Sequence, residues 1–145
     1  GNPPLMPLYR ESGCSDIAIV QINPIKQNGA PTSAREILNR MNEITFNTSL
    51  LKDLKALNFI KRLLNEGSLD TSKYRDMNLH VVECQDELAP LGASSKLNSE
   101  WEFLVHLRDL GRATAEEWLK ANFDHIGKNS TLDLDALFEG GDHFG

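Results

Sequence analysis

The feature of this sequence that most constrains the fold is a short apolar segment, "DIAIVQIN", at residues 16–23. It is rich in β-branched residues, it carries apolar side chains on both faces of an extended chain, and Pro24 closes it. A strand that is apolar on both faces is typical of a sheet buried between helical layers. We therefore expect a strand here, and a second strand in "NLHVVEC" at residues 78–84.

Helical patterns occupy the chain between these two segments. Ser33 and Glu36 have the spacing of a capping box and predict a helix that begins there. A second helix is expected over about residues 49–65, ended by Gly67. The order of strand, helix pair and strand predicts an α/β fold.

Two more helices are predicted nearer the C-terminus. One covers about residues 98–110 and ends at Gly111. Thr114 and Glu117, again at the capping-box spacing, begin the other, which ends at Gly127. The prediction is thus a helix-rich α/β chain with about two strands and four helices. Because two strands make a poor independent sheet, the first strand is expected to need neighbours that the chain does not supply.

The ends of the chain are predicted to be less regular. Three prolines within residues 2–8 disfavour a helix there and indicate an extended connector. Residues 134–145 are expected to form a flexible tail, which leaves residues 1–133 as the folded segment.

Composition limits the function classes. A chain of 145 residues fits one domain, and its net charge of −6 argues against nucleic acid or an anionic membrane as an electrostatically chosen partner. Cys14 and Cys84 are expected to be packed, reduced thiols. No apolar run approaches the ~20 residues that a membrane span needs, and no signal peptide is evident, so a cytoplasmic protein is expected.

No complete active site can be read from the spacing of the residues. "GASSK" at residues 92–96 lacks the second glycine of a G-x-S-x-G motif, so Ser94 and Ser95 are interpreted as loop or capping residues. Glu102 and His106 lie one helical turn apart, where they could share a metal, but a solvated pair is favoured because no third ligand is evident. No metal or other cofactor is predicted.

The remaining candidate residues are isolated. None of His80, His125 and His143 has an obvious catalytic partner in the sequence. A basic face on the second helix could meet lipid headgroups, although a solvated face is favoured because Asp53 and Glu66 dilute its charge. The basic residues are Lys52, Lys55, Lys61 and Arg62.

Three stretches of the chain resemble the C-terminal part of bacterial patatin-like phospholipases. They are "GNPPLMPLYRESGCSDIAIVQINP", "TSAREILNRMNEITFNTSLLKDLKALNFI" and "ASSKLNSEWEFLVHLRDLGRATAEEWL", and the resemblance covers about residues 1–133. It implies an α/β fold whose catalytic Ser–Asp dyad lies in a G-x-S-x-G elbow and an Asp-Gly turn. In that family Asn-Pro follows the aspartate turn, which matches Asn2 and Pro3. These two residues would then lie near the mouth of the active site.

The resemblance implies a C-terminal part of a serine lipid acyl hydrolase, with both dyad residues upstream of Gly1. This chain alone would then be inactive. Its expected partners are the upstream catalytic half of the same protein and, for the whole enzyme, a lipid ester, together with further copies of the chain. The alternative is a non-catalytic helical module that binds a partner protein through exposed apolar helix faces.

Overall fold

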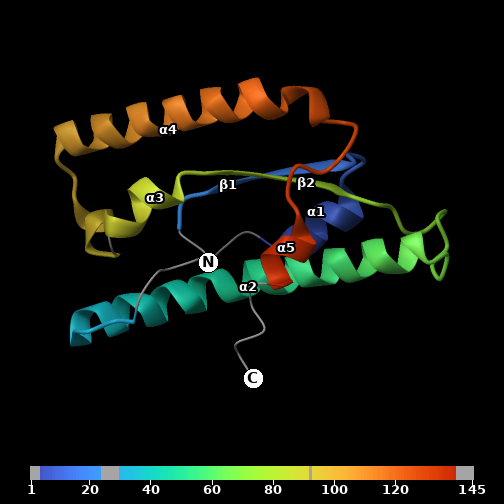
Figure 1. Cartoon of the computed structure of the whole chain (residues 1–145), viewed down its shortest axis with the longest axis horizontal. Helices are drawn as coiled ribbons and strands as arrows, with labels where there is room; N and C mark the ends of the chain where they lie inside the picture. The colour runs from blue at the N-terminus through green and yellow to red at the C-terminus, as the bar shows by residue number, and fades with distance from the viewer. Residues whose placement is uncertain (1–3, 24–29, 92, 140–145) are drawn as a thin grey trace. The chain divides into compact units, whose positions relative to one another are not determined.

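The computed structural model describes residues 4–23, 30–91 and 93–139 of the chain (Figure 1). These residues form five α-helices and two strands, so the prediction of a helix-rich α/β chain is confirmed. Three short 3₁₀ segments are η1 (Ala89–Leu91), η2 (Ala93–Leu97) and η3 (Phe123–His125). The order of the other elements is α1 (Leu5–Glu11), β1 (Asp16–Gln21), α2 (Ala34–Asn65), β2 (Asn78–Glu83), α3 (Gln85–Leu88), α4 (Trp101–Asn122) and α5 (Leu134–Glu139).

The two strands lie where the sequence predicts them. They pair into a two-stranded parallel sheet, in the order β1–β2. The backbone N–H of Asn78 donates to the carbonyl of Ser15 across 2.8 Å, which fixes the register where the pairing begins. The pairing therefore brings the first residues of both strands to the same end of the sheet.

The chain divides into two compact units. The first unit comprises residues 1–19, 48–81 and 124–145, and the second comprises residues 20–47 and 82–123. β1, α2 and β2 each continue from one unit into the other.

The core of the described chain lies in the first unit. Leu54 is completely buried and Leu79 is 1% exposed, and both come from elements that the sequence predicts as apolar. The buried hydrophobic side chains are Leu5, Tyr9, Ile17, Leu50, Leu54, Leu57, Met77, Leu79 and Leu134, all of them in this unit.

The second unit instead exposes large apolar side chains. Val20, in β1, is 73% exposed, whereas Ile17 in the same strand is 6% exposed. The strand is therefore apolar on both faces, as expected, but the described chain buries only the face that carries Ile17. The exposed large apolar residues of this unit are Val20, Ile22, Ile37, Leu38, Met41, Ile44, Leu97, Trp101, Leu104, Leu119 and Phe123.

Helix α1 replaces the predicted extended connector over residues 5–8. Pro7 falls in the first turn of the helix, where its missing N–H would have no partner within the helix. Asp53 of α2 caps the N-terminal end of α1. Its Oδ2 accepts hydrogen bonds from the N–H of Leu5 at 2.6 Å and from the N–H of Met6 at 3.4 Å. The prediction is wrong because the stabilising carboxylate comes from a distant part of the chain.

Helix α2 is one helix of 32 residues, not the predicted pair. The capping box at its start is confirmed: Glu36 N–H donates to Ser33 Oγ (3.2 Å), and Ser33 N–H donates to Glu36 Oε2 (3.3 Å). Thr45, a poor helix former, sits in the middle, and its hydroxyl donates to the carbonyl of Met41 at 2.8 Å. At the other end Gly67 takes φ +71°, as predicted for a terminating glycine.

Helix α4 likewise merges two predicted helices. Among the described glycines, φ is positive at Gly67 and Gly127 but not at Gly111, so Gly111 continues the helix at a cost of about 1 kcal/mol. Thr114 is consequently inside the helix, and the predicted capping box with Glu117 is wrong. Residues 134–139 also differ from the prediction, because they form α5 with Leu134 only 8% exposed. That burial within the first unit stabilises a segment that the sequence predicts as a flexible tail.

Candidate functional site

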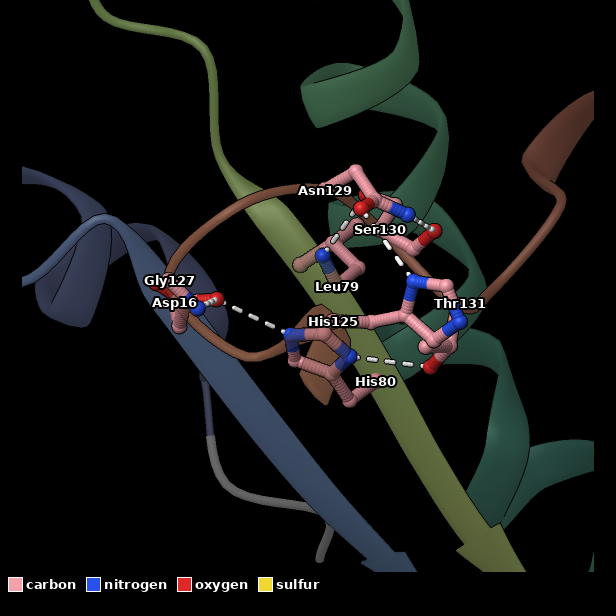
Figure 2. Close-up of polar contacts among 8 residues, drawn as sticks. All are labelled: Asp16, Leu79, His80, His125, Gly127, Asn129, Ser130 and Thr131. Carbon is pink, nitrogen blue, oxygen red and sulfur yellow. Dashed lines mark hydrogen bonds and ion pairs between the residues drawn. The ribbon is translucent and has the colours of Figure 1, made fainter. Parts of the chain in front are cut away.

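A histidine in β2 connects three segments of the first unit (Figure 2). The Nε2 of His80 lies 2.9 Å from Oδ1 of Asp16, the first residue of β1. Its Nδ1 lies 2.9 Å from Oγ1 of Thr131, in the loop that precedes α5. His80 is 1% exposed, so these two contacts satisfy a buried ring at both nitrogens.

The charge of Asp16 determines the direction of these hydrogen bonds. The pKa of Asp16 is lowered, first by the hydrogen bond from His80 and second by the backbone N–H of Gly127, which donates across 2.8 Å. An ionised carboxylate only accepts, so we infer that Nε2 of His80 carries the shared proton. Nδ1, on the other side of the ring, faces the hydroxyl of Thr131.

The backbone beside His80 holds the same loop. Leu79 N–H donates to Oγ of Ser130 at 2.9 Å, and Leu79 O accepts from the N–H groups of Thr131 (3.1 Å) and Leu132 (2.9 Å). Together with the contacts of Asp16 and His80, these bonds fasten residues 127–132, the C-terminal latch, to both strands (Figure 2).

Carboxylate, imidazole and hydroxyl in this order match the roles of orienting group, base and nucleophile in hydrolases. Both distances also fall in the range that proton transfer requires. At 1% exposure, however, His80 offers a substrate almost no surface, and each ring nitrogen already has a partner. We interpret the cluster as a structural fastening of the latch.

Sequence reasoning missed this cluster. It found no obvious catalytic partner for His80 and did not foresee that Asp16 and Thr131 lie within hydrogen-bond distance of its ring. An acidic residue at the start of an apolar strand was the available signal for Asp16. Thr131 gave no comparable signal, since nothing in the sequence shows that its loop returns to β2.

The structure scatters the other predicted candidates. Asn2, Pro3 and His143 lie outside the described residues. Ser95 lies in η2, and His125 Nδ1 lies 3.2 Å from Oδ1 of Asn129.

The charged candidates on α2 and α4 do not form a site either. Glu102 and His106 are exposed on α4, and the described residues contain no group of three side chains that could hold a metal ion. The basic face of α2 is broken up, because Lys55 Nζ lies 5.4 Å from the ring centroid of Phe138 and Lys61 Nζ lies 3.6 Å from Asp76. Within the described ranges, no helix combines the length and apolarity needed to cross a membrane.

Both cysteines are free thiols, as predicted. The expectation that both are packed is wrong for Cys14, which is exposed, whereas Cys84 is half-buried. Comparison with known family models, curated proteins and solved structures found no match to this chain.

Proposed function

We propose that this chain is the C-terminal part of a patatin-like lipid acyl hydrolase. In this proposal the nucleophilic serine and the catalytic aspartate lie upstream of Gly1, and the chain contributes strands and helices to the enzyme. The support is the sequence resemblance over about residues 1–133, together with the helix-rich α/β class of the chain.

One structural observation carries the proposal furthest: the large apolar side chains that the second unit exposes. Val20 is 73% exposed in a strand, and Trp101 is 74% exposed at the start of α4. Burying a medium-sized apolar side chain stabilises a protein by roughly 1.5–3 kcal/mol, so several such residues left in water favour association. Further sheet strands and helices of the same enzyme would cover these side chains.

The chemistry of the proposed enzyme follows from the dyad. The serine would attack the carbonyl carbon of a lipid ester while the aspartate accepts its proton, and backbone N–H groups would hold the oxyanion. The residues of this chain take no part in that step. The Asp16–His80–Thr131 cluster is assigned to the latch because its base is buried and already paired at both nitrogens.

The alternative is a helical module that binds a partner protein. The same exposed apolar residues on α2 and α4 favour it, since apolar helix faces are common docking surfaces. It differs from the first proposal in requiring no hydrolase motif in the same reading frame.

Hydrolysis of p-nitrophenyl esters tests the proposal. The 145-residue chain alone should give only the background rate, whereas the protein translated from the upstream-extended reading frame should hydrolyse the ester. Replacing the elbow serine of the longer protein by alanine should abolish its activity. Activity of the 145-residue chain that persists through repurification and disappears in Thr131→Val would assign the chemistry to the His80 cluster and contradict the proposal.

A further inference from the structure

The second unit contains a pocket of about 550 Å³, within the range usual for small-molecule sites. β1 leads into it, α2 and α4 contribute to its walls, and Ser95 and Lys96 of η2 are among its polar lining residues. Its apolar lining consists of Ile22, Phe46, Leu88, Leu91, Leu107 and Leu110.

A single ammonium group is held at the wall of this pocket. Lys96 Nζ donates to Oδ1 of Asn23 at 2.6 Å and lies 5.3 Å from the centroid of the Phe46 ring. Both of these residues line the pocket, and Asn23 is only 5% exposed. The ammonium is therefore fixed between a buried amide and an aromatic face at the pocket wall.

This lysine retains capacity for a ligand. An ammonium has three N–H donors, and within the described chain Lys96 donates only to Asn23. A carboxylate that accepts one of the other two hydrogens would form a charge-assisted hydrogen bond. The apolar walls would then surround whatever is attached to that carboxylate.

We propose that this pocket binds an aliphatic monocarboxylate, with its carboxylate on Lys96 and its hydrocarbon chain along the leucine-lined walls. Glu43 also lines the pocket and opposes a negative ligand, which limits the affinity but supplies a sharp test of its charge. The inference rests on the geometry of the second unit and does not depend on the proposed hydrolase.

Isothermal titration of the 145-residue chain with dodecanoate, below micelle-forming concentrations, tests this inference. We expect one site, with affinity that falls about fourfold for each methylene removed, since each buried CH₂ contributes about 0.8 kcal/mol. Dodecyltrimethylammonium, with the same chain length and the opposite charge, is the ligand control. Equal binding of the two amphiphiles, or several equivalent sites, would mean non-specific binding to exposed apolar residues and would overturn the proposal.

Four variants separate the contributions of charge. Lys96→Met should weaken dodecanoate binding about tenfold, Lys96→Arg should retain most of it, and the matched surface variant Lys52→Met should not change it. Glu43→Gln should tighten dodecanoate binding about threefold, because it removes a negative charge that repels the carboxylate.

Each variant is first checked for wild-type helix content by circular dichroism. Weaker dodecanoate binding in Glu43→Gln, or unchanged binding in a folded Lys96→Met, would contradict an anionic ligand. A failure of this kind would leave the proposed hydrolase untouched, because ester hydrolysis is measured separately on the longer protein.

Discussion

The carboxylate of Asp16 and the imidazole of His80 lie 2.9 Å apart, joining the first residue of β1 to the interior of β2. The same oxygen of Asp16 accepts from Gly127, and the far side of the ring meets Thr131. Through these contacts the C-terminal latch is attached to both of the short parallel strands. The strength of this attachment depends on the charge of Asp16.

Replacing Asp16 by asparagine should lower the free energy of unfolding by about 1–2 kcal/mol at pH 7, because a charge-assisted hydrogen bond becomes a neutral one. The pKa of Asp16 is lowered in the folded state, chiefly by His80. Its contribution is therefore fully present above the ordinary value of 3.8 and is lost as the pH falls through the lowered folded value.

Urea unfolding of wild type and Asp16→Asn at pH 7 and at low pH measures this difference. The gap between the two proteins should narrow below about pH 4. The control Asp109→Asn, in an exposed pair with Arg108, should change stability little at either pH. An equal gap at both pH values would contradict the role assigned to the charge of Asp16.

Replacing Thr131 by valine should loosen the latch. The change removes the hydroxyl that pairs with Nδ1 of His80 and leaves a buried ring nitrogen unsatisfied, which costs about 1–3 kcal/mol. Hydrogen exchange should accelerate at the amides of Gly127, Thr131 and Leu132. Thr71→Val, at an exposed threonine, is the control, and unchanged exchange in the latch would refute the assignment.

Replacing Asp53 by alanine should destabilise α1 by about 1 kcal/mol, the usual cost of losing a helix N-terminal cap. The N–H groups of Leu5 and Met6 lose their carboxylate acceptor in this variant, so their exchange should accelerate first. Glu66→Ala, just beyond the C-terminal end of α2, should leave these amides unaffected. If the exchange of Leu5 stays at the wild-type rate in Asp53→Ala, the remote cap contributes nothing to α1.

Helix boundaries show where sequence reasoning succeeds. The capping box of Ser33 and Glu36 and the terminating Gly67 are local features, so both could be predicted from neighbouring residues. Gly111 misled the prediction because only a positive φ makes a glycine terminate a helix in this way, and the sequence does not reveal φ. Asp53 could not be predicted as the cap of α1, because 48 residues separate it from Leu5.

In the candidate sites, too, local features could be predicted from the sequence whereas contacts between distant segments could not. His80 could be placed in a strand from the apolar pattern around it, but its partners depend on strand register and on the return of a loop. The Lys96 pocket depends on which helix faces meet, and two of the helix boundaries that form it were predicted incorrectly. Contacts between distant segments therefore account for most of what the sequence left open.

Replacing Val20 by lysine should weaken self-association of the chain. Val20 is 73% exposed in β1, and a large apolar side chain left in water favours association with another apolar surface. Sedimentation at tens of micromolar should show dimers or larger species of the wild type, with an association constant reduced about tenfold or more in Val20→Lys. Thr71→Lys adds the same charge at an exposed polar position and should associate like the wild type. A wild-type monomer under these conditions would contradict the prediction.

The sequence of the DNA upstream of the codon for Gly1 tests the central claim most directly. The account predicts, in the same reading frame, a Gly-x-Ser-x-Gly motif followed by an Asp-Gly turn close to that codon. An open reading frame that lacks both motifs would contradict the hydrolase proposal. It would leave the helical interaction module as the account of the exposed apolar side chains.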